Sequence, residues 1–593
     1  MARNQVKVNE YDIEEQKRES KLGPHYKWVA LSNTTLGVLM ATIDSSILII
    51  SLPAIFNGLG VNPLISSNIT LLLWLLLGYI IMSSVVVVTI GRLSDMFGRV
   101  RLYNLGFAIF TIGSTLLYVV SYTLTGTTAV LILIIFRLIQ GFGGGFLFAN
   151  STAILTDAFP QNQRGTALGI NQISAIMGSV LGLVIGGVLS AIDWHLIFMI
   201  SVPVGIIGTV WSYLALREIA TIRKNQKLDL VGNITFALSL TIILLSMTYG
   251  LLPYGTSTTG WSNPYVIGGL VLGLALIVVF IIVELRSSDP MFNLGLFKIR
   301  AFSAGILSLF LAGMARGGLQ FMLIIWLQGI WLPLHGVSFT HTPLQAGLDM
   351  IPLLLGFLVI GPLAGHLSDR YGARLFATAG MIINVIGFLL LATLPVNFNY
   401  VSFAVIIFIL GMGQGMFAAP NTTSVMNAVP PEQRGATSGM RATFTNISFM
   451  FSMVIFFTLL IIGFGTSLPN TLYNGLVLQS VPVATAQAIS KLPPTSALFA
   501  ALLGYNPMQT LLPQNVIQSI SKANLTVITG NSFFPNLIAQ PFIEGMHTVL
   551  IVAAIMAGIA AIASALRGKR YINVVKTSFT NRTNKKSALR DNV

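Results

Sequence analysis

Cysteine is absent from the 593 residues of the chain, which excludes disulfides, thiolate metal sites, iron–sulfur clusters and cysteine nucleophiles. Charged residues are scarce as well. They make up 9% of the chain, against about a quarter in ordinary soluble domains, whereas hydrophobic residues make up 54%. This composition excludes an ordinary soluble enzyme and indicates a chain that lies largely within a membrane.

The sequence patterns of common nucleotide and catalytic sites are also missing. The chain contains no G-x-x-x-x-G-K-[ST] loop and no H-E-x-x-H, G-x-S-x-G or G-x-G-x-x-G string, so it lacks the usual marks of ATPases, zinc proteases, hydrolases and dinucleotide sites. The glycine run at 141–145 lies inside an apolar stretch and indicates helix packing. We therefore expect no enzymatic activity, no cofactor, no metal and no built-in ATPase.

Long apolar runs recur almost from end to end. A hydrocarbon core of about 30 Å needs roughly 20 apolar residues per helix, so these runs predict an all-α, polytopic membrane protein with fourteen transmembrane helices. The first run is too long for a signal-peptide core and follows a polar tail, residues 1–27. The predicted helices cover residues 28–56, 67–90, 102–122, 127–150, 165–191, 195–216, 228–250, 264–285, 302–330, 345–366, 375–395, 400–423, 436–463 and 542–566.

Lys and Arg are distributed unevenly over the predicted loops. The chain has 33 Lys and Arg against 18 Asp and Glu, a formal net charge of +15. With alternate loops assigned to the cytoplasm, all Lys and Arg fall on that side except Lys491, Lys522, Arg137 and Arg316. This is the positive-inside pattern. It predicts a cell-membrane protein whose two tails, 1–27 and 567–593, are cytoplasmic, and it leaves no need for nucleic-acid binding.

An internal repeat divides the chain. Residues 91–99 (GRLSDMFGR) recur as residues 365–373 (GHLSDRYGA), and residues 160–165 (PQNQRG) recur as residues 430–435 (PPEQRG). The repeat predicts two six-helix bundles, residues 28–216 and 301–566, linked by two inserted helices within 217–300. Two such repeats are a transporter architecture, with the substrate site near the membrane midplane between them.

The repeated loop between the second and third helices combines acid and base. Asp95 can pair with Arg99 or with a neighbouring bundle and so latch one conformation; in the alternative, the basic residues only hold the loop on the cytoplasmic side. The predicted latch, with its second-half counterpart, comprises Gly91, Asp95, Gly98, Arg99, Arg101, Asp369 and Arg370.

Three charges lie near the centres of predicted helices: Asp44, Arg137 and Arg316. Each costs roughly 2.5–3.5 kcal/mol on insertion scales, so such residues are functional candidates by default. Asp44 and Arg137 are the predicted proton-coupling pair, facing one cavity; a purely structural buried pair is the alternative. Asp349 and Glu544 lie nearer the outer ends and are weaker candidates. The predicted substrate cavity includes Asp44, Arg137, Gln140, Arg316, Gln320 and Asp349.

Glycines in the fifth predicted helix share a spacing of four. Gly178, Gly182 and Gly186 have the small-residue spacing that lets membrane helices approach closely, and Gly187 follows directly. We predict helix packing here, with a role in antiport as the alternative.

Together these motifs resemble the major facilitator superfamily, specifically its fourteen-helix drug:proton antiporter branch. The resemblance covers about residues 28–463 and the last helix. It rests on the loop motif at 91–101, the stretch from Asp44 to Pro53, the set Arg137, Gln140 and Gly141, and the glycines from 178 to 187. Val100 and Leu183 depart from the family pattern, which has a basic residue and a proline there. The resemblance implies proton-coupled export of amphipathic, often cationic, compounds.

The segment 464–541 is too long for a plain connector. It alternates apolar patches with Pro and Gly, which predicts short helices on the outer membrane face. His335 and His341 fall in another outer loop. We interpret them as solvated loop residues, with a pH-sensing role as the alternative.

The sequence therefore predicts a monomeric secondary transporter that uses protons and a small-molecule substrate and works by alternating access in the lipid bilayer. Two alternatives remain. One is a proton-coupled importer or metabolite exporter of the same fold, for which Arg316 together with Arg137 would favour an anionic cargo. The other is a membrane sensor or scaffold that transports nothing.

Overall fold

The computed structural model describes residues 23, 25–62, 66–160, 163–219, 229–255, 257–287, 290, 292–430 and 433–568. Within these ranges every named element is a helix, and 14 helices are long and apolar enough to cross a membrane. The predicted all-α fold with fourteen transmembrane helices is therefore confirmed. Most of the two predicted tails, 1–22 and 569–593, lies outside the described residues.

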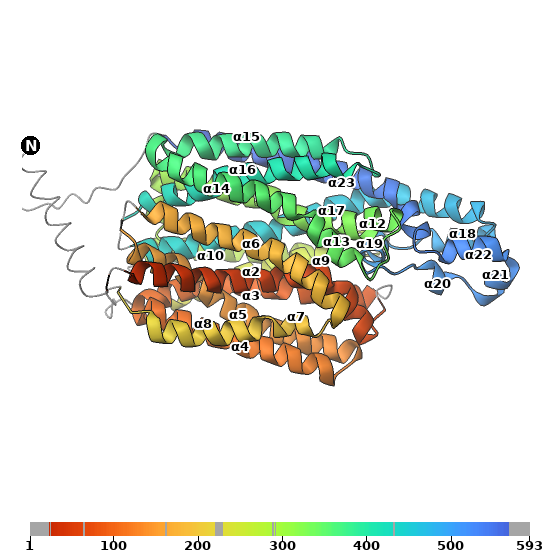
Figure 1. Cartoon of the computed structure of the whole chain (residues 1–593), viewed down its shortest axis with the longest axis horizontal. Helices are drawn as coiled ribbons and strands as arrows, with labels where there is room; N and C mark the ends of the chain where they lie inside the picture. Colours follow the sequence, from red (N-terminus) through yellow and green to blue (C-terminus); the bar gives the residue numbers. More distant parts are fainter. Residues whose placement is uncertain are drawn as a thin grey trace, which may run out of the picture.

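The first six spans form one bundle, with α4, α5 and α8 along the bottom of Figure 1. Glycine permits the tight turn between two of them: Gly98 separates α3 from α4 with a φ of 108°, a conformation that only glycine adopts without strain. The spans are α2 (Tyr26–Leu59), α3 (Ser66–Phe97), α4 (Arg99–Thr123), α5 (Gly126–Ala158), α6 (Arg164–Ile192), and α7 (Leu196–Met199) with α8 (Ser201–Ala215).

Two further spans follow, α9 (Leu230–Gly250) and α10 (Pro264–Arg286), which pack against each other. Large apolar side chains of α10 are exposed along its length, among them Val271, Leu274 and Val278. In a membrane protein such a surface faces lipid. The two inserted helices thus add a lipid-facing layer beside the bundles.

The last six spans form the second bundle, with α15, α16 and α23 along the top of Figure 1. They are α11 (Arg300–Ile324) continued by the π-helical η2 (Ile325–Trp331) and α12 (Leu332–Leu334), α13 (Thr342–Asp349) with α14 (Ile351–Tyr371), α15 (Ala373–Ala392), α16 (Tyr400–Asn427), α17 (Arg434–Leu478) and α23 (Phe533–Ala565).

The backbone repeats as the sequence does. Gly372 separates α14 from α15 with a φ of 93°, as Gly98 separates α3 from α4. The packing repeats too, since α3 and α4 pack against α5, and α14 and α15 against α16. Two equivalent turns and two equivalent sets of helix pairs support the division into two bundles.

The segment between the last two spans is shorter than the predicted 464–541. Helix α17 continues to Leu478 because buried apolar residues recur every four positions, at Phe464, Leu468 and Leu472, whereas the intervening polar residues resemble a loop. Helix α23 already begins at Phe533. Residues 479–532, here called the cap, form α18 (Val483–Ile489), α19 (Pro494–Leu502), α20 (Met508–Leu511), α21 (Gln514–Ser519) and α22 (Lys522–Thr529).

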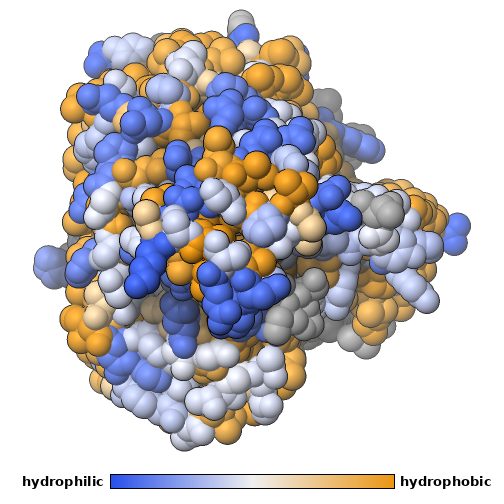
Figure 2. Space-filling model, turned by 90° about the vertical axis from the view of Figure 1, so that its right-hand side faces the viewer, coloured by the Kyte–Doolittle hydropathy of each residue, from blue (hydrophilic) through white to orange (hydrophobic). Residues whose placement is uncertain are grey.

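The cap lies at one end of the bundles. It projects beyond the transmembrane helices at the right of Figure 1, and hydrophilic and hydrophobic residues are interspersed over this end of the molecule (Figure 2). Its α19 is almost entirely buried and contacts η2, α17 and α23. We call this end of the molecule the cap end and the opposite end, where Arg99 lies, the latch end.

The bundles contact each other at both ends. At the cap end α6 meets α13: a Cβ on Gly187 would lie 2.5 Å from the Cα of Leu344. Toward the latch end α3 meets α17: a Cβ on Gly439 would lie 3.7 Å from the Cα of Gly91. These close approaches enclose the space between the bundles, where the candidate site lies.

Candidate functional site

A cavity of about 290 Å³ lies between the two bundles. Helices α2, α3, α5 and α6 form one wall, and α11, α15, α16 and α17 form the other. Aromatic rings and thioethers supply much of the apolar surface, including Phe148, Phe388, Phe417, Phe449, Met381 and Met453. Ligand pockets combine such surfaces with a few placed polar groups, so the cavity suits an amphipathic organic molecule.

The charges on the cavity wall have one sign. Arg316 and Arg441 line it, and its described lining includes no Asp or Glu. Gln320, also predicted to be in the cavity, lies on the wall with its Nε2 unpaired. Arg441 is 6% exposed and donates one hydrogen bond, to Thr152 Oγ1 of the first bundle at 3.2 Å. The wall therefore attracts anions more than cations.

Asp44, Arg137 and Gln140 form a buried network inside the first bundle. Arg137 pairs with Asp44 and donates to Gln140 Oε1 at 2.5 Å, while Gln140 Nε2 donates to Asp44 Oδ1 at 2.8 Å. Each of the three is at most 1% exposed. The structure thus brings together the predicted coupling pair, but none of the three lines the cavity, which differs from the sequence prediction.

Tyr79 lies between this network and the cavity. Its ring is on the cavity wall, and the guanidinium of Arg137 lies over the ring, 4.8 Å from its centroid. Glycines of the run at 141–145 leave room for it, since a Cβ on Gly144 would lie 2.6 Å from the Tyr79 hydroxyl. Tyr79 therefore links the cavity wall to the ion pair.

Asp349 lies apart from both the network and the cavity. It is the last residue of α13, it is 4% exposed, and its Oδ1 accepts a hydrogen bond from Gln345 Nε2 at 3.0 Å. It is not part of the cavity lining. Because α13 also carries the contact of Leu344 with Gly187, Asp349 belongs to the cap-end contact between the bundles rather than to the cavity.

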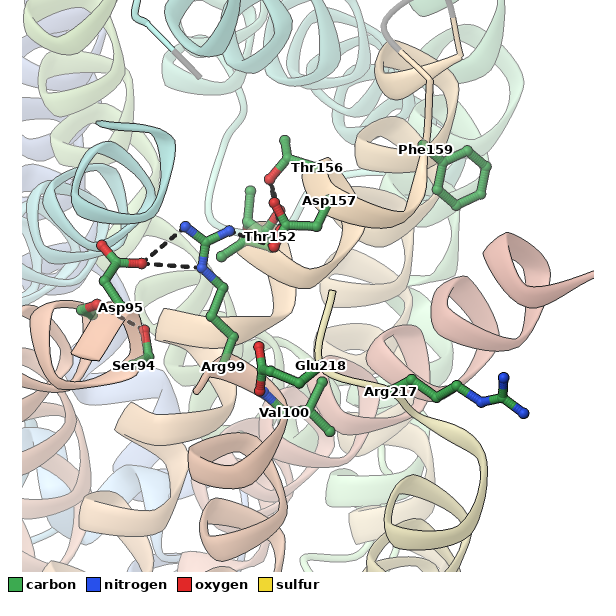
Figure 3. Close-up of polar contacts among 12 residues, drawn as sticks. Ser94, Asp95, Arg99, Val100, Thr152, Thr156, Asp157, Phe159, Arg217 and Glu218 are labelled. Atoms are coloured by element: carbon green, nitrogen blue, oxygen red, sulfur yellow. Dashed lines mark hydrogen bonds and ion pairs between the residues drawn. The ribbon is translucent and has the colours of Figure 1, made fainter. Parts of the chain in front are cut away.

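Two of the predicted latch residues, Asp95 and Arg99, meet at the latch end (Figure 3). Arg99 donates to Asp95 Oδ1 from Nε at 3.0 Å and from Nη2 at 2.8 Å, and it also pairs with Asp157 of α5. Arg99 is only 7% exposed. Charge-assisted hydrogen bonds of this kind are strong. Those to Asp95 join α4 to α3, and the ion pair with Asp157 joins α4 to α5, all within one bundle.

A third carboxylate, that of Glu218, contacts the turn between α3 and α4. Glu218, which follows α8, accepts a hydrogen bond from the Val100 backbone N–H at 2.9 Å, and a Cβ on Gly98 would lie 2.6 Å from its Oε2. Burial raises the pKa of the Glu218 carboxyl, while the hydrogen bond from Val100 acts in the opposite direction. Glycine at position 98 is therefore required for space as well as for its φ.

The second half keeps the turn but not the arginine that makes the ion pairs of the first half. Ala373 stands where the first half has Arg99. Arg370 is exposed, 5.5 Å from the centroid of the Tyr371 ring, and the side chain of Asp369 lies outside the described part of the structure. Arg101 is also exposed. The latch cluster is thus a property of the first bundle.

The predicted packing glycines line the contact between α6 and α2. A Cβ on Gly178 would lie 2.9 Å from the Leu39 carbonyl oxygen, and one on Gly182 would lie 2.6 Å from that of Ile43. Ser46 Oγ donates to the Gly178 carbonyl at 3.3 Å. Gly186 meets side chains of α2, whereas Gly187 faces the second bundle.

Sequence reasoning missed four residues of these sites: Tyr79, Asp157, Glu218 and Arg441. Arg441 carried a usable signal, because it lies inside the predicted helix 436–463 and a charge at that depth needs a reason. Asp157 and Glu218 follow the predicted helices 127–150 and 195–216, at positions typical of solvated loop residues. Tyr79 is one aromatic residue among many, and only the fold reveals its place beside Arg137.

Comparison with known proteins gives a consistent result. The family model described as Major Facilitator Superfamily matches residues 34–315 and 231–453. The riboflavin transporter RibZ of Clostridioides difficile is 31% identical over 72% of this chain and 87% of that protein. Multidrug resistance protein 3 of Bacillus subtilis is 28% identical over 71% of this chain and 77% of that protein, and the multidrug transporter protein MdtP of the same organism is 25% identical over 92% and 93%.

Solved structures support the same fold. The proton:xylose symporter XylE aligns with a TM-score of 0.52 over 82% of this chain and 96% of its own, at 15% identity. A POT family peptide transporter aligns with a TM-score of 0.52 over 93% of this chain and 98% of its own, at 14% identity. At such low identity the likeness concerns the fold alone.

Proposed function

The chain belongs to the major facilitator superfamily and is a multi-pass membrane transporter rather than an enzyme, and from this premise we propose that it exports amphipathic organic compounds in exchange for protons. Both bundles and the cavity wall come from one chain, so we propose that a monomer suffices. We also propose that it resides in the cell membrane with both termini in the cytoplasm, as the distribution of Lys and Arg indicates.

The observation that carries the proposal is the buried network of Asp44, Arg137 and Gln140. Desolvation favours a protonated carboxyl, whereas a paired guanidinium favours the ionised one, so a small change in the position of Arg137 changes proton binding at Asp44. The contact of Tyr79 with both Arg137 and the cavity supplies the route. Substrate that displaces the Tyr79 ring would shift Arg137 and thereby alter the protonation of Asp44.

Exchange also requires that the cavity open to the two sides in turn. The contact of Gly187 with Leu344 would break to open the cap end, and the contact of Arg441 with Thr152 would break to open the latch end. The latch around Arg99 would then bias the equilibrium between these states through α3, α4 and α5.

A metabolite transporter of the same fold is the second candidate function. It is favoured by the similarity to RibZ, a riboflavin transporter, and by a cavity wall without an acidic side chain among its described residues. This candidate differs from the first in cargo and direction, not in the proposed use of Asp44 and Arg137.

Purified protein in liposomes would test the proposal. A thermal-stabilisation screen of amphipathic compounds and riboflavin identifies a ligand, and its flux is then followed under an imposed pH gradient, with an internal pH dye reporting proton movement. We expect ligand flux against its own gradient, coupled to proton flux in the opposite direction. Flux that ignores the pH gradient would reject proton coupling, and flux in the same direction as protons would replace export by import.

A further inference from the structure

We infer that the transported compound carries an anionic group, a carboxylate, sulfonate or phosphate, which Arg316 and Arg441 of the second bundle bind in the cavity. This inference rests on the proposed transport function and assigns its substrate class. It departs from the cationic cargo that the resemblance to drug antiporters implied.

The first step is that neither arginine has an anionic partner among the residues that the structure describes. Arg316 makes no ion pair or hydrogen bond within the described ranges. Within the same ranges Arg441 makes only the bond to Thr152, and its Nε finds no acceptor there although the residue is 6% exposed. Intramembrane charges normally pair with one another or line a path for charged substrates. Two unneutralised guanidinium groups on one cavity wall are therefore explained if the ligand brings the negative charge.

The second step is that the described acids are either paired with another arginine or absent from the cavity lining. Asp44 is held by Arg137 and Gln140, Asp95 and Asp157 by Arg99, and Asp349 by Gln345 outside the cavity lining. None of these acids lies on the cavity wall. In this conformation the arginines thus find no described carboxylate within the protein.

The repeat supplies a third, independent step. At the offset of 270 that relates residues 160–165 to 430–435, Arg441 corresponds to Asn171, which also lines the cavity and donates to Ser151 Oγ at 3.1 Å. At the offset of 274 that relates residues 91–99 to 365–373, Arg137 corresponds to Gly411. The first bundle therefore hides its charged pair behind a neutral wall, whereas the second exposes its charge to the cavity.

The remaining wall defines the rest of the ligand. Phe388 and Phe417 of the second bundle and Phe148 of the first line the cavity together with the two arginines. A planar guanidinium suits bidentate binding of a carboxylate or phosphate, and the aromatic wall suits a ring system. An aromatic or amphipathic organic anion fits both features.

Binding of three naphthalene compounds to the purified full-length protein would test the inference. 1-Naphthaleneacetate, 1-naphthaleneacetamide and 2-(1-naphthyl)ethylamine share one ring system and differ in charge. Titration calorimetry at neutral pH is expected to give at least tenfold tighter binding of the acetate than of the amide or the amine. Arg316→Gln and Arg441→Gln should each reduce this preference at least fivefold, and Arg316→Lys should retain charge but lose part of the preference.

Arg286→Gln is the matched control, because Arg286 is exposed at the end of α10, away from the cavity, and should leave all three affinities unchanged. Unfolding temperatures identify any variant that fails to fold; in that case Arg316→Lys and the preference of the unmodified protein decide the result. Equal binding of the three compounds, tighter binding of the amine, or no binding at all would overturn the inference. Because no gradient is used, proton-coupled flux can still succeed or fail separately.

Discussion

The guanidinium of Arg137 lies 4.8 Å from the centroid of the Tyr79 ring, and the same ring lines the cavity between the bundles. One aromatic side chain therefore touches both the buried ion pair and the space where a ligand fits. Gly141 and Gly144 create the slot that holds it, since a Cβ at either position would lie 2.6 Å from an atom of Tyr79. The glycine run thus positions the Tyr79 ring as well as packing α5 against α3.

Tyr79 is expected to couple ligand binding to proton release. Tyr79→Phe keeps the ring over Arg137, so exchange should remain within about twofold to threefold of normal. Tyr79→Leu removes the cation–π contact, worth about 0.5–2 kcal/mol, and should reduce ligand-driven proton release by about 2- to 30-fold while ligand still binds. Proton release on ligand addition to detergent-solubilised protein measures this, and equal release in the two variants would exclude a role for the ring.

Asp44 is expected to be the proton-binding group. Asp44→Asn removes the charge but leaves Arg137 buried without its anion, which costs roughly 3–5 kcal/mol of stability. The double variant Asp44→Asn/Arg137→Gln should recover much of this stability because it buries no charge. Both variants should lose uphill flux, and the double variant should retain downhill counterflow of labelled ligand. Uphill flux in the double variant would remove Asp44 from the mechanism.

Much of the fold could be predicted because membrane burial imposes a simple pattern on the sequence. Each span needs about 20 apolar residues, and the loops at 91–101 and 365–373 mark the same turn twice. The pattern failed where a helix leaves the hydrocarbon core. Residues 464–478 carry a buried apolar stripe and a polar face, so a search for continuous apolar runs assigns them to a loop.

The candidate site could be predicted only in part. The cost of intramembrane charge selected Asp44, Arg137 and Arg316, and the structure places the first two in contact. The sequence could not reveal that Asp44 lies behind Tyr79 rather than on the cavity wall, because the rotation of a helix about its axis depends on packing against neighbours that are distant in sequence. Arg441 lies inside the predicted helix 436–463, but only the fold shows that it lines the cavity and bonds to Thr152 of the first bundle.

Weakening the latch around Arg99 is expected to change the equilibrium between conformations rather than the affinity for ligand. Asp157→Asn removes one of two carboxylates from the buried Arg99, a charge-assisted bond worth about 1.5–3 kcal/mol. If the bond forms only in this conformation, the equilibrium should shift by about 10- to 160-fold. Single cysteines introduced at cavity positions, possible because the chain has no cysteine, report the shift by their labelling rates. A large loss of affinity with unchanged labelling rates would contradict the latch.

The raised pKa of Glu218 predicts that the stability of the protein depends on pH. Burial raises its pKa above the ordinary value of 4.5, so the folded protein holds this proton more tightly than the unfolded chain does. The stability that the group contributes is therefore complete below pH 4.5 and is lost as the pH rises through the folded-state pKa. Glu218→Gln keeps an acceptor for the Val100 N–H and should raise the unfolding temperature at pH 7 but not at pH 4. An equal effect at both pH values would show that the carboxyl does not titrate as proposed.

The glycines of α6 allow a test in which space alone changes. In Gly182→Ala the new Cβ would lie 2.6 Å from the Ile43 carbonyl oxygen and 2.1 Å from Ser46 Oγ, so α2 and α6 must separate. Overpacking of this kind costs about 1–3 kcal/mol, and we expect a lower unfolding temperature together with slower exchange. Gly268→Ala in α10 is the matched control, because nothing lies within 4 Å of its new Cβ and alanine favours the helix. Equal unfolding temperatures for the two variants would mean that α2 and α6 have room to relax and that the close approach at Gly182 does not limit stability.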